Sequence, residues 1–217
     1  MKDLNKYRVK PKSRVRLKDI STKEHGGMNE EAAKQELKQL LQRMESLHEL
    51  MYADGRQALL VVLQAMDTAG KDSTIQSVFT GFNPIGCWVK SYKAPNDTEL
   101  EHDFLWRIHQ NVPRLGHIAV FNRSHYEDVL VVRVKKLVPI KQVEKRYAHI
   151  NAFEKLLHDE GTRIVKFYLH ISKEYQKERL LRRLSMPDKL WKFDPGDLVE
   201  RKRWNDYRRA YEEAMER

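Results

Sequence analysis

Hydrophobic residues between positions 29 and 55 recur with the spacing of one face of an α-helix. These residues are Leu37, Leu40, Leu41, Met44, Leu47 and Met51. Intervals of three and four residues place them on one side of a helix, so the pattern predicts an amphipathic helix over residues 29–53. Asn29 is a suitable N-cap, and Asp54-Gly55 is expected to end the helix.

Four further stretches have the apolar character of β-strands. Residues 58–64 read ALLVVLQ, a continuous apolar run that is typical of a short strand buried on both faces. Other strands are predicted at Cys87–Ser91, His117–Phe121 and Thr162–Leu169, and helices at about 71–80, 97–110, 140–159, 172–184 and 197–217. Residues 124–134 fit either a strand or a short helix. The alternation predicts an α/β fold with a parallel sheet between two layers of helices.

The first 28 residues follow another pattern. Cationic residues alternate with others from Lys6 to Lys18, and Gly26-Gly27 follows, which predicts an extended basic arm over residues 1–28. The arm either wraps a neighbouring subunit or lies in solvent. At the other end the sequence stops inside the helical pattern YEEAMER, and we expect that a final C-terminal strand is absent from it.

Composition excludes several classes of protein. Among 217 residues Cys87 is the one cysteine, so no internal disulfide can form, and a cytoplasmic location is expected. The longest apolar run, 58–63, is far shorter than the roughly 20 residues that span a membrane, so no membrane partner is expected. Lys+Arg number 41 and Asp+Glu 31, a net charge of +10 that favours an anionic partner. A surplus that only maintains solubility is the alternative.

The clearest chemical signal follows the first predicted strand. Residues 65–74 read AMDTAGKDST and open a helix, so a strand, a turn of small residues and a Gly-Lys pair come in the order of a phosphate-binding loop. Backbone N–H groups at such a turn bind an anion, and Lys71, expected to be exposed, would reach a phosphate. The match to G-x-x-x-x-G-K-[ST] is imperfect, because Ala65 replaces the first glycine and Asp72 the hydroxyl residue. A chance turn is the alternative.

Polar residues follow two of the predicted strands. Asp67 is either a metal ligand or the acceptor of a proton from an attacking phosphate, unless it only bonds its own turn. Asn122 can accept a hydrogen bond from a metal-bound water, and Arg123 can bind phosphate oxygens. Glu127 or Asp128 would supply further negative charge. Because the carboxyl ends of parallel strands share one edge of the sheet, these residues are predicted to face one crevice.

A cationic region follows the fourth predicted strand. Arg179, Arg182 and Arg183 are offset by three and four residues, which predicts that they share one helical face. Lysines and arginines continue to position 209, so an extended polyanion could bind along this region. A solvated helix with pairs such as Glu178 with Arg182 is the alternative.

Residues after the phosphate loop could contact a nucleotide. Asn83 and Pro84 follow the helix at about 71–80, where a turn can reach a base or ribose. Phe79 or Phe82 could stack on the base, although phenylalanines at such positions are more often part of the core.

Several motifs together resemble the polyphosphate kinase 2 family of P-loop kinases. They are VVLQAMDTAGKDSTI (61–75), FNPIGCWVKSYKAP (82–95), FNRSHYEDVLVVRV (121–134) and KFYLHISKEYQKERLLRRL (166–184). The resemblance implies a three-layer α/β/α P-loop kinase domain over residues 29–217, with a helical lid at about 172–195. It also implies Mg²⁺-dependent phosphoryl transfer between inorganic polyphosphate and nucleoside mono- or diphosphates, such as AMP and ADP, and assembly as a homodimer or homotetramer. Asn122 followed by RSHYEDV resembles the class III subgroup, which acts on both kinds of nucleotide.

The resemblance also implies roles for individual residues. Catalytic residues are expected to be Asp67, Lys71, Arg123 and Arg183, and metal ligands Asp67 and Asn122. Phosphates are expected to contact Ala69, Gly70, Lys71, Asp72, Ser73, Thr74, Arg179, Arg182 and Arg183. The nucleotide is expected to contact Phe79, Asn83, Asn122, Arg123, Glu127 and Arg133.

Two other functions compete with this hypothesis. An ATP-dependent nucleoside monophosphate kinase would share the loop and the lid, but the long basic stretches favour an extended polyanion. A nucleic-acid-binding module would explain the charge, but the sequence has no recognition-helix, zinc-finger or aromatic RNA-binding signal, so no nucleic-acid partner is expected.

Overall fold

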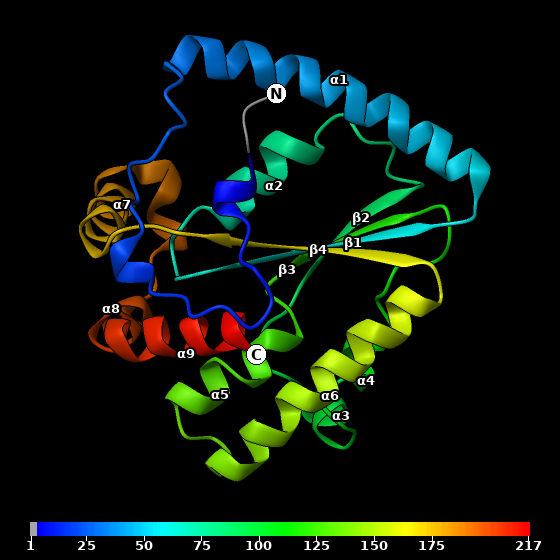
Figure 1. Ribbon diagram of the computed structural model, residues 1–217. Helices are drawn as coiled ribbons and strands as arrows, with labels where there is room; N and C mark the ends of the chain where they lie inside the picture. The colour runs from blue at the N-terminus through cyan, green and yellow to red at the C-terminus, as the bar shows by residue number, and fades with distance from the viewer. Residues whose placement is uncertain (1–3) are drawn as a thin grey trace.

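The computed structural model describes residues 4–217 and has a four-stranded parallel sheet at its centre (Figure 1). The strands are β1 (Ala58–Ala65), β2 (Cys87–Ser91), β3 (Ile118–Asn122) and β4 (Thr162–Leu169), in the spatial order β2-β3-β1-β4. Every pairing is parallel. The four predicted strands are confirmed to within one residue at each end, and the predicted α/β class is confirmed with them.

Helices cover both faces of this sheet. α1 (Glu30–Asp54) and α2 (Lys71–Phe79) lie on one face, and α5 (Val131–Val134), α6 (Ile140–Asp159) and α9 (Trp204–Glu216) on the other (Figure 1). The fold therefore has the three layers that were predicted. No helix within residues 4–217 is long and apolar enough to cross a membrane.

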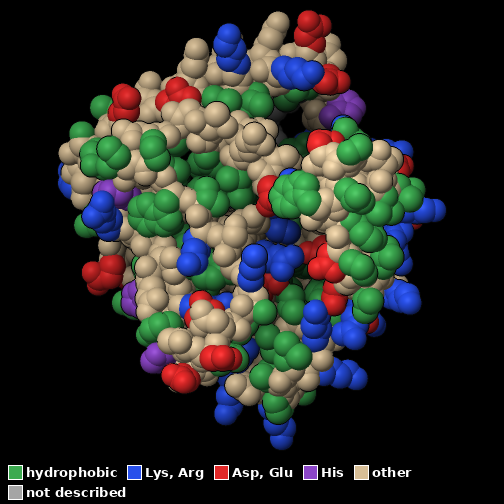
Figure 2. Space-filling view, turned by 180° about the vertical axis from the view of Figure 1, so that it is seen from behind, with side chains coloured by type: hydrophobic (Ala, Val, Ile, Leu, Met, Phe, Trp, Pro, Cys, Tyr) green, Lys and Arg blue, Asp and Glu red, His purple; other side chains and the backbone are tan. Residues whose placement is uncertain are grey.

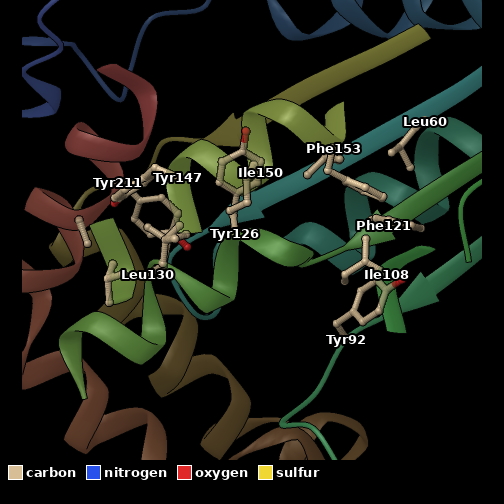
Figure 3. Packing of buried hydrophobic residues seen from close by; sticks show 14 of the residues in the cluster. Leu60, Tyr92, Ile108, Phe121, Tyr126, Leu130, Tyr147, Ile150, Phe153 and Tyr211 are labelled. Carbon is tan, nitrogen blue, oxygen red and sulfur yellow. The ribbon is translucent and has the colours of Figure 1, made fainter. Parts of the chain in front are cut away.

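The side chains of β1 belong to two separate cores. Leu60 and Val62 pack in the larger core with α6 and α9, whereas Val61 and Leu63 pack in the smaller core with α1 and α2. Successive residues of a strand point to opposite faces, so a strand covered on both sides is apolar throughout. Figure 3 shows the larger core, with Tyr92, Ile108 and Phe121 at one end and Leu130, Tyr147 and Tyr211 at the other.

Both ends of α1 follow the prediction. The Asn29 side chain accepts a hydrogen bond from the Ala32 N–H and caps the helix. Gly55 ends it with a left-handed φ of 64°, a conformation that glycine adopts without steric cost.

The prediction of one helix over residues 97–110 is wrong. Two short helices, α3 (Asp97–Leu100) and α4 (Trp106–His109), are separated by a turn. In this turn Asp103 Oδ1 accepts a hydrogen bond from the Leu105 N–H at 2.9 Å. A side chain that takes over a backbone amide in this way competes with the helical hydrogen-bond pattern, which is why the helix is interrupted.

The basic arm packs against α9 of its own chain. Val15 and Leu17 are buried, and their N–H groups donate to Glu216 Oε1 at 2.9 Å and to Glu212 Oε1 at 2.8 Å. The cationic side chains at positions 14, 16 and 18 remain exposed, which explains the alternating pattern. Short 3-10 turns at Leu4–Tyr7 and Leu17–Asp19 interrupt the extended backbone. Residues 1–3 of the predicted arm lie outside the described residues.

Candidate active site

The turn between β1 and α2 presents free backbone amides. Thr74 N–H donates to the Gly70 carbonyl, but within residues 4–217 no acceptor engages the N–H groups of Gly70, Lys71, Asp72 and Ser73. These are the donors that a helix leaves unsatisfied at its first turn, where the helix dipole also favours an anion. Thr68, with φ 66°, and Gly70, with φ 101°, bend the chain into the turn. Residues 65–74 therefore have the geometry of a phosphate-binding loop.

Lys71 is buried rather than exposed, so that expectation is wrong. Its side chain folds back under the loop, with Nζ 3.5 Å from the Ala65 carbonyl oxygen, and the residue is 8% exposed. Burial, and then the positive charge of Arg123, lower the pKa of Lys71, although nearby carboxylates, first Asp67, oppose the shift. A phosphate bound at the loop would replace the Ala65 carbonyl and the nearby carboxylates as partners of the Lys71 ammonium.

Two polar pairs join the loop to the end of β3. Arg123 Nη2 lies 2.6 Å from Asp67 Oδ1, and Asn122 Nδ2 donates to Asp72 Oδ1 at 2.7 Å. Parallel pairing of β1 and β3 places Leu63 beside Asn122, so both strands end at the same edge of the sheet. Asp67, Asn122 and Arg123 are therefore together, as predicted, whereas Asp128 forms ion pairs with Arg107 and Arg146. Seen from behind, lysine and arginine side chains meet acidic ones around a hollow near the centre of the molecule (Figure 2).

Glu127 lies in the same place, on a 3-10 turn (His125–Asp128) that leads into α5. The ambiguous residues 124–134 are thus helical. Burial raises the pKa of Glu127, although the positive charges of Arg123 and Lys71 oppose the shift. With Asp67 and Arg123 it lines a cavity of about 40 Å³. A cavity of that size holds one or a few water molecules, so a nucleotide needs the site to open.

The lid approaches the loop from the far side of the crevice. α7 (Lys173–Ser185) and a 3-10 turn (Pro187–Lys192) form most of it, and α8 (Pro195–Lys202) follows. A Cβ built on Gly70 would lie 3.7 Å from Arg179 Nη2, so this guanidinium is directly above the loop. Arg183 Nη1 lies 2.9 Å from Asp197 Oδ2 on α8. Arg182 is exposed, and its Nε contacts Met186 Sδ rather than the loop, so the three arginines have different partners.

Three residues predicted to contact the nucleotide have partners within the protein. Phe79 packs against Phe82, with ring centroids 5.2 Å apart, at the far end of α2 from the loop. The Asn83 side chain accepts a hydrogen bond from the Ile85 N–H. Arg133 forms an ion pair with Glu213 of α9. Their assignment to the nucleotide stays a prediction, and each already has a partner within the protein.

Two residues contact the loop that the sequence did not indicate. The Tyr211 hydroxyl donates to the Ala65 carbonyl oxygen at 2.9 Å, and Gln176 Nε2 donates to the Asp67 carbonyl oxygen at 2.8 Å. Both are buried and both lie more than 100 residues from the loop. A lone polar residue on the inner side of a charged helix is the only signal that could have drawn attention to Gln176.

The chain is similar to several known proteins. The family model described as polyphosphate kinase 2 (PPK2) matches residues 27–217. The AMP/ADP-polyphosphate phosphotransferase of Meiothermus ruber is 53% identical over 216 residues, which cover 98% of this chain and 80% of that protein. The ADP-polyphosphate phosphotransferase of Rhodopseudomonas palustris is 48% identical over 191 residues, 82% of this chain and 66% of that protein.

A solved structure agrees with these matches. The crystal structure of polyphosphate kinase 2 from Arthrobacter aurescens superposes with a TM-score of 0.90 at 41% identity, and the match covers 95% of this chain and 77% of that one. The family model and the match to the Meiothermus relative extend across the phosphate loop, the end of β3 and the lid. The chain therefore belongs to the polyphosphate kinase 2 family.

Proposed function

We propose that this protein transfers a phosphoryl group from inorganic polyphosphate to AMP or ADP. The observation that carries the proposal is the set of four free amides at the start of α2, with Lys71 beneath them and Arg179 above. The names of the Meiothermus and Rhodopseudomonas relatives support polyphosphate and adenine nucleotides as the substrates.

The arrangement favours catalysis by positioning and charge neutralisation. Phosphoryl transfer requires little acid–base chemistry, so aligned reactants and fixed positive groups supply most of the rate. The amides of the loop and Lys71 would hold phosphate oxygens of one substrate. Arg123 and Arg183 now pair with Asp67 and Asp197, and an arriving phosphate competes with these carboxylates for them.

A magnesium ion fits the oxygen donors at the strand ends. Asp67 and Asp72 present carboxylates, and the Asn122 amide that donates to Asp72 leaves its own oxygen available. Residues 4–217 contain no cluster of three or more His, Cys, Asp or Glu side chains that could hold a metal. Mg²⁺ does not need such a cluster, because it is usually bound by one or two carboxylates, waters and substrate phosphates. When bound, it would neutralise charge on the transferred group, with Asp67 as its principal protein ligand and Asn122 beside it.

The remaining features of the proposal follow the family resemblance. The exposed cations of the lid and α8 would bind the polymer, and both AMP and ADP would be acceptors. A homodimer or homotetramer in the cytoplasm is part of the same proposal. Light scattering coupled to gel filtration tests the assembly, because a monomer at micromolar concentration contradicts it.

The decisive experiment compares two phosphate donors. AMP and ADP are each incubated with Mg²⁺ and either polyphosphate or ATP, and the nucleotides are separated by ion-exchange chromatography. Formation of ADP and ATP with polyphosphate supports the proposal. Activity with ATP alone would instead support an ordinary nucleoside monophosphate kinase.

A further inference from the structure

Gln176 links the lid to the phosphate loop. The residue is 3% exposed, and both ends of its amide are hydrogen-bonded. Nε2 donates to the Asp67 carbonyl oxygen at 2.8 Å, and Oε1 accepts from Arg201 Nη1 at 3.0 Å. A buried amide with a donor partner on one side and an acceptor partner on the other is held in a single orientation. A flipped amide would place its NH₂ group against the Arg201 donor and its oxygen against the Asp67 carbonyl oxygen.

The contact of Gln176 with the loop also fixes the position of Arg179, which lies one turn further along α7. Residues three apart lie on the same side of a helix, about 4.5 Å apart along its axis, so Gln176 and Arg179 both face the loop. Arg179 Nη1 donates to the Tyr175 hydroxyl of the same helix at 3.1 Å. No carboxylate in residues 4–217 forms an ion pair with Arg179, so its place above Gly70 depends on where α7 lies.

We propose that Gln176 is a positioning residue, which holds α7 so that the Arg179 guanidinium lies above the phosphate loop. The inference rests on the proposed function, in which a phosphate occupies that space. In this proposal Gln176 acts through the position of the helix rather than by contact with a substrate. Arg201 supports it, because the same Nη1 that donates to Gln176 also donates to the Lys173 carbonyl oxygen at 2.6 Å and so fixes the start of α7.

A Gln176→Glu variant tests this contact with little change in shape. The new carboxylate retains Arg201 as a partner. It cannot donate a hydrogen bond to the Asp67 carbonyl oxygen, and that oxygen repels the carboxylate oxygen that faces it. We expect kcat to fall by about tenfold or more, with the KM for AMP changed less than twofold. Gln142→Glu, an exposed change in the first turn of α6, is the matched control and should retain wild-type kcat. A variant with wild-type kcat at position 176 would overturn the proposal.

A double-mutant cycle separates positioning from a general effect on folding. If Gln176 acts through Arg179, Gln176→Glu should change kcat less than twofold in a protein that already carries Arg179→Ala. An equal loss in both backgrounds would show that Gln176 acts independently and would overturn the proposal. Thermal unfolding is followed for every variant, and Gln176→Met, which fills the same space without a charge, replaces Gln176→Glu in the cycle if the latter does not fold.

A binding measurement distinguishes failure of the positioning role from failure of the proposed function. If the wild-type protein transfers nothing from polyphosphate to AMP, the proposed function fails. The same cycle is then read by calorimetry with tripolyphosphate as the probe. Weaker binding in Gln176→Glu only while Arg179 is present would still support the positioning role, whereas equal weakening in both backgrounds, or unchanged binding, would overturn it.

Discussion

Arg123 Nη2 lies 2.6 Å from Asp67 Oδ1, so the residue after β3 is ion-paired with the phosphate loop. Arg123 has a left-handed φ of 64°, which a residue other than glycine adopts at a cost in free energy. The backbone is therefore held in an unfavourable conformation at the point where the guanidinium reaches the loop. Such strain is typical of sites where geometry serves binding or catalysis rather than stability.

Asp67→Asn should weaken the use of magnesium. The change removes the charge that would bind the ion and also leaves Arg123 without its carboxylate. We expect the Mg²⁺ concentration at half-maximal activity to rise by at least about tenfold, since removing even a partner of a metal ligand has an effect of that size. A magnesium titration of the rate measures it. Asp206→Asn, an exposed change on α9, is the control, and an unchanged titration for Asp67→Asn would remove this residue from the metal site.

Lys71→Met should abolish turnover without loosening the fold. The ammonium is buried, and a buried charge costs desolvation that an apolar side chain of similar length does not. We expect kcat to fall by about 100-fold or more and the melting temperature to stay equal or rise. Kinetics and thermal unfolding are compared with Lys155→Met, whose lysine is exposed on α6. Retained turnover, or a melting temperature well below that of the wild type, would contradict this explanation.

Gly70→Ala and Gly55→Ala form a matched pair. Both glycines have left-handed φ angles, 101° and 64°, so each alanine should destabilise the protein by about 1–2 kcal/mol. A Cβ at Gly55 would meet nothing within 4 Å, whereas at Gly70 it would lie 3.3 Å from Ser73 Oγ and 3.7 Å from Arg179 Nη2. We therefore expect only Gly70→Ala to abolish activity, as measured by nucleotide formation from polyphosphate. Equal activity in the two variants would mean that no phosphate passes over Gly70.

Glu154 should make stability depend on pH in the acid range. Burial alone would raise the pKa of this α6 carboxyl, but hydrogen bonds and charges from His125 and Lys166 lower it to about 2, from 4.5. A carboxyl whose pKa is lowered on folding stabilises the folded state at pH values above its ordinary pKa. This contribution is lost as the pH falls toward 2. Between pH 5 and pH 3 the loss should be about 2 kcal/mol.

Urea unfolding at pH 5 and pH 3 measures this contribution. Glu154→Gln has no such titration, so the wild type should lose about 2 kcal/mol more than the variant over the interval. Asp159→Asn, at the exposed end of α6, is the control and should follow the wild type closely because its ion pair with Lys155 is open to solvent. The same pH dependence in Glu154→Gln and the wild type would contradict the assignment.

The accuracy of the predictions differs between the fold and the site. The strands and the helices α1, α2, α6 and α7 agree with the sequence because each has its own period, whereas the single helix predicted over residues 197–217 is wrong, because α8 ends at Lys202 and α9 begins at Trp204. The loop at 65–74 could be predicted because a phosphate site needs a strand, a turn and a helix in succession. The spacing of the three lid arginines did not indicate which of them reaches the loop, because spacing alone cannot say which side of a helix meets its neighbours. Arg182 faces solvent, while Arg179 lies above Gly70.

The sequence by itself determined the order of the strands and most helices along the chain, the phosphate loop and the cationic character of the lid. These properties are local, since they depend on residues within a turn or two of one another. Only the tertiary structure decided that Lys71 is buried, that Arg133 pairs with Glu213, and that Gln176 and Tyr211 bind the loop backbone. Each of these depends on how distant segments pack, and a contact between residues 80 or more apart leaves no period in the chain.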